Sequence, residues 1–193
     1  MTWRGVWSGG FLGVALAWTG AAAKVPTPSV QQLAEAAEVV VVGRVAEIVT
    51  VPGVRAFHAS STRIAIVAVE ETLKGPVAAR WAYVASRHSF CDVTTAQIGE
   101  RAVFFLAEVA HCHDAEPHAA PLAAASRFGV ERLHAIAYSG RGRWPIRLLE
   151  GVEHAELRDV FLSDGIPVVD GGTKASPMVY MSVAVLREIL GVP

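Results

Sequence analysis

The sequence predicts a mostly β protein, built as a small closed barrel of strands with a short helix near each end. Three long runs of β-branched and other apolar residues, at 38–51, 61–73 and 101–110, have the length and composition of buried strands. Gly43 interrupts the first run and indicates a bulge or bend there. Several bent strands favour closure into a barrel over an open sheet, because closure removes the exposed strand edges.

The N-terminal half of the chain is predicted to hold one helix and four strands. Ser29 and Gln32 have capping-box spacing, which predicts a short helix that ends near Ala37. Strands are predicted to follow at 38–51, 61–73, 80–85 and 101–110, and a turn at 74–76 is predicted to separate the second strand from the third.

Beyond residue 126 the sequence predicts a β extension and a terminal helix. The stretch 139–143, rich in glycine and arginine, predicts a hairpin-like turn between short strands near 132–138 and 144–149. Ser182 is expected to cap the last helix, an amphipathic stretch that reads VAVLREIL. The remaining elements are predicted as a strand pair at 157–162 and 166–169 and a loop at 170–173.

Residues 1–23 have the order of a secretory signal peptide. Arg4 precedes an apolar run from Phe11 to Trp18, and small residues up to Ala23 follow this run. We expect cleavage after Ala23 and export to the periplasm or the extracellular space, with an uncleaved N-terminal anchor as the alternative. No later stretch has membrane-span length without a charge, so we expect no membrane association after cleavage. The expected organisation is a signal peptide at 1–23, a barrel domain at 24–126, and a β extension with the terminal helix, packed on the same domain, at 127–193.

The composition narrows the classes of function. The 193 residues are 52% hydrophobic, which excludes a disordered chain, and a formal net charge of -1 argues against nucleic-acid binding. The chain contains no Gly-x-Ser-x-Gly, P-loop, Gly-x-Gly-x-x-Gly or His-Glu-x-x-His motif. We therefore expect a non-enzymatic binding module without a cofactor, whose partner is a protein or a small-molecule ligand.

Cys91 and Cys112 are the two cysteines of the chain. Paired thiols become disulfides in an oxidising compartment, so export predicts a Cys91–Cys112 bridge. In the chain-entropy model a bridge over a loop of this size stabilises the fold by about 3 kcal/mol.

Three histidines near these cysteines form a candidate metal site. His111 and His113 flank Cys112 and lie on one side of any extended segment, and a disulfide would bring His88 close to them. Neutral imidazole suits both Zn and Cu. The alternative function is therefore a metal-binding protein or a metal-dependent enzyme. If these histidines bind no metal, we expect them to lie in a solvated polar loop.

Arg141, Arg143 and Arg147 surround Trp144 and predict a basic, aromatic patch. We interpret this patch as a charged hairpin tip whose arginines pair with the acidic residues that follow or face water. An acidic partner or a carbohydrate is the alternative use of such a patch.

Five pieces of the sequence occur in a recognisable order: VVVVGRV (39–45), VEETLKGP (69–76), Cys91, IGERAVFFL (98–106) and Cys112. This order resembles exported bacterial members of the netrin/tissue-inhibitor-of-metalloproteinase-like family. The resemblance covers about half of the predicted mature chain and implies an OB-like barrel of five strands.

The resemblance does not extend to the inhibitory mechanism of the animal members. Those proteins bind the zinc of a protease through an N-terminal cysteine, whereas the predicted mature chain here starts at Lys24. They also hold more disulfides than two cysteines can make. A protease inhibitor is thus a further alternative, and it requires a mature N-terminus other than the predicted one.

Overall fold

The computed structural model describes most of the chain beyond the predicted signal peptide. The described residues are 27–51, 62–76, 80–87, 97–108, 133–138, 141–158, 160–163, 165–173 and 176–192. In chain order the elements are α1 (Val30–Ala36), β1 (Val39–Val51), β2 (Thr62–Lys74), β3 (Trp81–Arg87), β4 (Arg101–Glu108), β5 (His134–Ile136), β6 (Arg143–Leu149), β7 (Val152–Leu157), β8 (Val169–Thr173), β9 (Ser176–Ser182) and α3 (Val183–Ile189).

The first five strands close into a barrel. Their hydrogen-bonded order is β1-β2-β3-β5-β4, and a further pairing of β4 with β1 completes the ring. Neighbouring strands are antiparallel except β3 and β5, which run parallel. The predicted OB-like closed barrel of a mostly β protein is therefore confirmed. Its fifth strand, β5, lies beyond residue 126 and thus in the stretch that the sequence assigned to the extension.

β1 and β4 are buried on both faces, because they separate two apolar cores. Val41 and Phe104 belong to the core inside the barrel. Val42 and Phe105 point the other way, into a second core that α1, α3 and the C-terminal strands complete. Successive side chains of a strand point to opposite faces, so a strand that is buried on both faces is apolar at every position. This explains the unbroken apolar runs of the sequence.

α1 begins as the sequence predicts. The Ser29 hydroxyl accepts a hydrogen bond from the Gln32 backbone N–H at 3.1 Å, and the Gln32 side-chain oxygen accepts one from the Ser29 N–H at 2.8 Å. At the other end of the helix, Lys74 donates to the carbonyl oxygens of Ala34 and Ala37. A cation at this position satisfies the last carbonyls and ties the end of β2 to the helix.

Gly43 bends β1 where the sequence predicts a bulge. The register of β1 against β2 shifts between Val42 and Gly43. A Cβ atom at Gly43 would lie 2.6 Å from Val67 Cγ1 and 2.7 Å from the Ala68 carbonyl oxygen. Only glycine allows the two strands to approach this closely.

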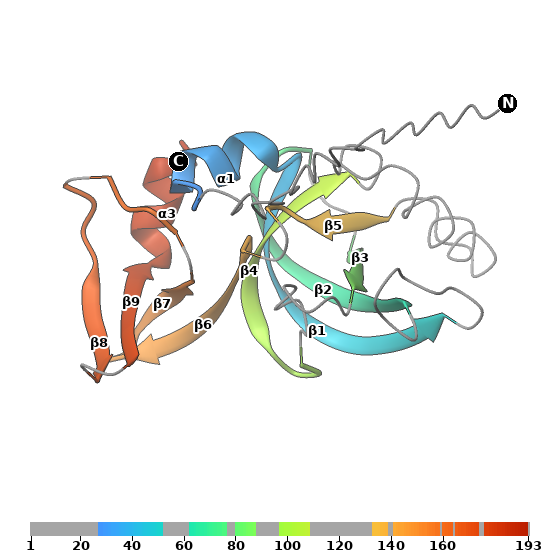
Figure 1. Cartoon of the computed structure of the whole chain (residues 1–193). Coiled ribbons are helices and arrows are strands. Elements are labelled where there is room, and N and C mark those ends of the chain that lie inside the picture. The colour runs from blue at the N-terminus through green and yellow to red at the C-terminus, as the bar shows by residue number, and fades with distance from the viewer. Residues whose placement is uncertain are drawn as a thin grey trace, which may run out of the picture.

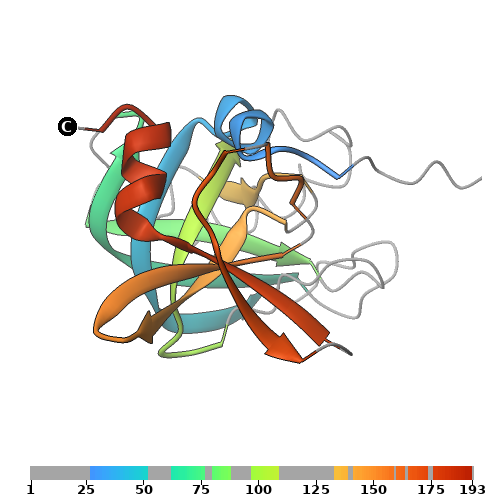
Figure 2. The same ribbon diagram turned by 90° about the vertical axis from the view of Figure 1, so that its left-hand side faces the viewer.

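The strands β6, β7, β9 and β8, in this order, form a C-terminal sheet beside the barrel, and the pairing of β6 with β4 makes it continuous with the barrel strands. In Figure 1 this sheet and α3 lie to the left of the barrel, and α1 lies above. Figure 2 shows the same sheet in front of the barrel. Ala155 and Met181 point from its inner face into the second core.

The predicted hairpin around 139–143 is wrong. Ile136 of β5 and Arg143 of β6 pair with Leu106 and Phe104 of β4, so both strands follow the same edge of β4 in succession. The chain leaves this edge of β4 after Ile136 and returns to it at Arg143. A local turn signal cannot reveal that the pairing partner of both flanking strands lies elsewhere in the chain.

The C-terminal strands also differ from their predicted positions. β7 covers Val152–Leu157, whereas the prediction was 157–162. β8 and β9 form a hairpin where the sequence predicts a strand at 166–169 and a loop at 170–173. β8 reads VDGGT, and its aspartate and two glycines are typical of a loop.

The prediction for α3 is confirmed. The Ser182 hydroxyl accepts a hydrogen bond from the Val185 backbone N–H at 3.2 Å, and Leu186 is fully buried in the second core. Neither this helix nor any other in the described part of the chain is long and apolar enough to cross a membrane.

Candidate functional site

The five residues predicted from sequence as a disulfide and a metal site lie outside the described residues. These residues are Cys91, Cys112, His88, His111 and His113. Among the residues that are described, no three His, Cys, Asp or Glu side chains form a group that could hold a metal ion.

The two strands that lead to these residues lie on either side of β5 and run antiparallel to one another, because β3 is parallel to β5 and β4 is antiparallel to it. β3 ends at Arg87, and β4 ends at Glu108. His134, the first residue of β5, pairs with Val84 of β3 on one side and with Glu108 of β4 on the other. The chain therefore leaves β3 and β4 on the two sides of the same short strand and in opposite directions along it.

Two basic side chains lie on the inner surface of the barrel. His134 shares its face of β5 with the buried Ile136, and Arg63 shares its face of β2 with Ala65 inside the barrel. Both side chains are partly buried, and the Arg63 Nε atom has no hydrogen-bond partner among the described residues. The inner surface of the barrel is thus apolar along its middle, and these two basic side chains lie beyond the apolar part.

The outer wall of β2 and β3 is the second candidate surface. Ala82 and Val84 point into the barrel, so Trp81 and Tyr83 point outward from β3. Trp81 is paired with Ala68 of β2 and is 38% exposed, while Tyr83 is paired with Ile66. The Arg80 guanidinium lies 5.6 Å from the centre of the Trp81 ring, within the range of a cation–π contact.

This wall was not predicted from the sequence. The signal was present in the spacing of Trp81 and Tyr83, because aromatic residues two positions apart in a strand share one face. The face that they share can be assigned only once Ala82 and Val84 are known to be inside the barrel.

The predicted basic, aromatic patch is wrong. Trp144 is fully buried, and its indole N–H donates to the Arg141 carbonyl oxygen at 2.8 Å. Arg143 is 5% exposed, and one of its Nη atoms donates to both carboxylate oxygens of Glu100, at 2.6 and 2.7 Å. These groups stabilise the junction between barrel and extension. Arg147, the exposed arginine of β6, lies 3.4 Å from Glu156, so this arginine does pair with an acidic residue that follows, as expected.

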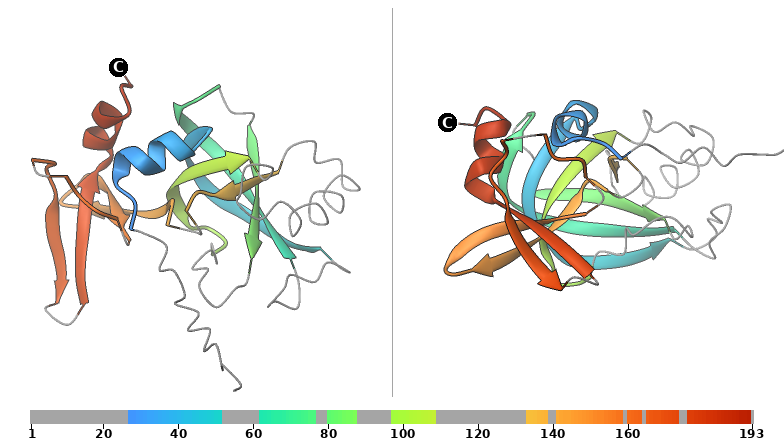
Figure 3. Two further views of the ribbon diagram at one scale, coloured as in Figure 1. Left: turned by 45° about the horizontal axis from the view of Figure 1, so that its top comes forward. Right: turned by 60° about the vertical axis from the view of Figure 1, so that its left-hand side comes forward.

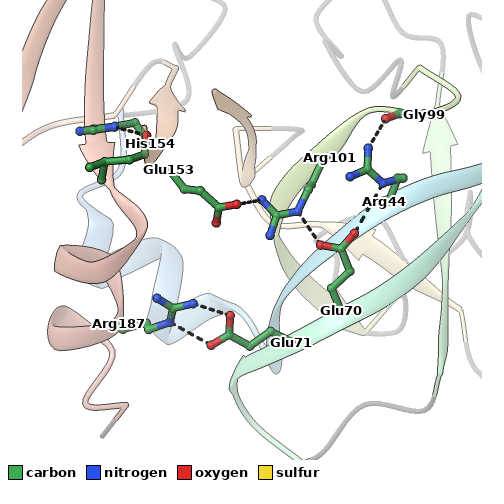
Figure 4. A network of polar contacts seen from close by, with 9 residues as sticks. Arg44, Glu70, Glu71, Gly99, Arg101, Glu153, His154 and Arg187 are labelled. Carbon is green, nitrogen blue, oxygen red and sulfur yellow. Dashed lines mark hydrogen bonds and ion pairs between the residues drawn. The ribbon is translucent and has the colours of Figure 1, made fainter. Parts of the chain in front are cut away.

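A chain of ion pairs joins the barrel to the C-terminal sheet (Figure 4). Arg101 of β4 lies between Glu70 of β2, at 2.5 Å, and Glu153 of β7, at 2.6 Å. Arg44 of β1 extends this chain, since its Nε atom lies 3.5 Å from Glu70. Burial acts to lower the pKa of Arg101, but its hydrogen bonds to Glu70 and Glu153 outweigh this effect and raise the pKa.

Arg187 and Glu71 make a second connection of the same kind. Arg187 of α3 donates two hydrogen bonds to the Glu71 carboxylate of β2, at 2.9 and 2.6 Å. These bonds lower the pKa of Glu71, despite partial burial, and raise the pKa of Arg187. Both ion-pair groups hold the extension against the barrel, and we interpret them as structural.

Comparison with known proteins gives no match. No family model, no curated protein and no solved structure matches this chain.

Proposed function

We propose that this chain is an exported, non-enzymatic binding module that holds a protein or small-molecule ligand on the outer wall of β2 and β3. The observation that carries this proposal is the outward-facing aromatic pair of that wall, in which Trp81 is 38% exposed and Tyr83 is partly buried. The opposite side of the barrel, formed by β1 and β4, is covered by α1, α3 and the C-terminal sheet.

The packing of the barrel favours an external site. Val41, Val67 and Phe104 are among the apolar side chains that fill the interior, each with 1% or less of its surface exposed. A barrel of this size has room for side chains but not for a ligand as well. OB-type barrels bind their ligands on the face of the second and third strands, which agrees with the position of Trp81 and Tyr83.

The chemistry of the wall indicates the class of ligand. Trp81 and Tyr83 offer large apolar surface on rigid strands, and such side chains lose little conformational entropy on binding. Arg80 adds a cation above the Trp81 ring. We therefore propose a ligand with an apolar or aromatic face next to an anionic group, such as an acidic peptide segment.

We further propose that a Cys91–Cys112 disulfide joins the segments that follow β3 and β4. The ends of these strands are two strand spacings apart and offset by three residues along β5, about 14 Å in all. Each cysteine follows its strand by four residues, which can span up to about 13 Å. The two thiols are thus within reach of one another. The order of motifs together with this barrel supports a distant relationship to the netrin/tissue-inhibitor-of-metalloproteinase-like family.

The second candidate function is a Zn or Cu site on the same two segments. His88 follows β3 directly, and His111 and His113 follow β4, so the three imidazoles share a metal ion where the segment after β4 turns back toward the end of β3. If the cysteines form a disulfide, the imidazoles are left to bind a metal without the thiols, whereas reduced cysteines can themselves act as ligands. Protease inhibition is a third candidate, and it requires an N-terminus other than Lys24.

Native mass spectrometry of the protein recovered from the exported fraction tests these proposals together. We expect a chain that starts at Lys24, is two hydrogens lighter than the reduced form, and carries no metal. We also expect a bound ligand that is lost in Trp81→Ala and retained in Leu148→Ala, a control that removes a 70% exposed side chain from the extension. A ligand retained by Trp81→Ala overturns the binding wall, and free thiols with a bound metal replace the disulfide proposal by the metal site.

A further inference from the structure

β8 is the last strand of the nine-stranded sheet and has a neighbour on one side. Closure removes the edges of the barrel strands, but β8 pairs with β9 alone, and no backbone hydrogen bond joins it to another described segment. Figures 1 and 3 show β8 at the outer margin of the C-terminal sheet. Its second edge therefore offers unpaired backbone N–H and C=O groups to another strand.

The outer face of this hairpin is apolar. Val169 of β8 is 48% exposed, and Met178 of β9 is 37% exposed. In the register of the hairpin Val169 pairs with Tyr180, and Gly171 pairs with Met178, so these residues share one face. The Tyr180 ring lies over Gly171, since a Cβ atom there would come within 2.5 Å of Tyr180 Cε2.

We infer that β8 pairs in antiparallel orientation with β8 of a second copy of this chain, around a two-fold axis at Gly171. This register joins the full length of the two five-residue strands. Asp170 is the one charged residue of β8, and in this register it lies opposite Gly172 of the second copy. Each carboxylate thus faces a glycine, whereas a register centred on Asp170 would oppose two like charges.

The side chains on the outer face support the same arrangement. Because Gly171 lies opposite Gly171 of the second copy, at a Cα distance of about 5 Å, the two Tyr180 rings that cover these glycines meet across the axis. Val169 and Met178 extend this contact on both sides. A two-fold interface requires one surface to complement itself, and β8 does so in length, charge and shape.

Sedimentation velocity over the micromolar range, on protein recovered from cells that express the full-length chain, tests this inference. We expect a monomer–dimer equilibrium. Hydrogen exchange of the β8 amides is expected to slow as the protein concentration rises, whereas exchange in β1 stays constant. A monomer throughout this range, or a dimer whose β8 amides exchange as fast as in the monomer, overturns the inference.

Charge variants test the register. Gly172→Asp places two aspartates opposite one another at both ends of the paired strands, which should weaken the dimer roughly tenfold. Adding Asp170→Lys to Gly172→Asp turns both repulsive pairs into attractive pairs and should restore the dimer. Gln31→Asp adds the same charge on α1, at an exposed position, and should leave the equilibrium unchanged.

The readouts separate weakened pairing from misfolding. Circular dichroism and thermal melting establish whether each variant folds, and the concentration dependence of exchange in the unaltered chain needs no variant at all. A folded Gly172→Asp protein that dimerises like the parent, or a double variant that stays monomeric, overturns the proposed register. If β8 instead pairs with an extended segment of a different protein, the purified chain should stay monomeric at every concentration. That outcome is the monomer result that overturns the inference.

Discussion

Phe104 and Phe105 are neighbours in the sequence, but substitutions at the two positions should affect the protein in different ways. Phe105 points into the second core, where its ring centre lies 4.6 Å from that of Trp144 at an interplanar angle of 60°. Phe104 points into the barrel and belongs to the other core. We predict that Phe105 is energetically coupled to Trp144 and that Phe104 is not.

The size of the coupling follows from the contact geometry. Phe105→Leu keeps an apolar side chain in a fully buried position and should cost roughly 1 to 1.5 kcal/mol. Trp144→Leu also loses the hydrogen bond to the Arg141 carbonyl oxygen and should cost about 3 kcal/mol. An edge-to-face aromatic pair contributes about 0.5 to 1.5 kcal/mol beyond its buried area, so the double variant should cost less than the sum by this amount.

Urea unfolding followed by far-ultraviolet circular dichroism gives the free energies of unfolding for this cycle. The set comprises the parent chain, the three single variants Phe104→Leu, Phe105→Leu and Trp144→Leu, and the two double variants that contain Trp144→Leu. Circular dichroism is preferred because Trp144 is itself a fluorophore that the cycle removes. Equal slopes against urea concentration establish that the denatured states are comparable.

The refuting result is a coupling of Phe104 to Trp144 that equals or exceeds that of Phe105. A shift of one residue moves every side chain of a strand to the opposite face. Such a result would therefore mean that β4 presents the other set of side chains to each core, and the assignment of two separate cores would fail.

Three further predictions concern single contacts. The hydrogen bonds from Arg187 lower the pKa of Glu71, so the stability that they add is complete above the ordinary value of 4.5 and declines as the pH falls below it. Arg187→Met should cost roughly 0.2 to 1 kcal/mol in urea unfolding at pH 7, because the pair is partly exposed, and this difference should shrink in acid; a difference that grows in acid contradicts the assignment. Gly43→Ala should cost about 1 to 3 kcal/mol in unfolding free energy, measured by denaturation, and an unchanged value would show that β1 and β2 can separate there. In a chain that begins at Lys24, iodide should quench the fluorescence of Trp81 but not that of Trp144, and Trp81→Phe should remove the quenched component.

Elements that depend on near neighbours in the sequence were predicted well. The capping box of α1 needs only Ser29 and Gln32, and the cap of α3 needs only Ser182, so each can be identified from a few residues. β1 and β2 were also predicted, because long β-branched runs favour buried strands wherever their partners lie.

Elements that depend on distant partners were predicted poorly. Trp144 lies between arginines in the sequence, yet its side chain is buried because β6 pairs with β4 and aligns it with Val103. β8 is a strand because β9 supplies its hydrogen bonds and Tyr180 covers Gly171, although aspartate and glycine disfavour strands. Neither partner can be deduced from residues close in sequence.

The candidate sites divide in the same way. The sequence identified the cysteines and histidines by residue type, and these predictions stand as they were made, outside the described residues. The aromatic wall was missed, because the exposure of Trp81 depends on which face of β3 the barrel encloses. Residue type indicates possible chemistry, whereas exposure is a property of the folded chain.

The position of β5 in the ring has a consequence for the order of events during synthesis of the chain. β5 contributes three residues, His134–Ile136, yet it joins β3 to β4 and closes the barrel. A chain that emerges N-terminus first must therefore wait, with the facing edges of β3 and β4 unpaired, until residue 136 has arrived. The segment 109–132 sets the length of this interval. Lengthening it would prolong the exposure of the nascent chain to aggregation while costing the finished protein little more than loop-closure entropy.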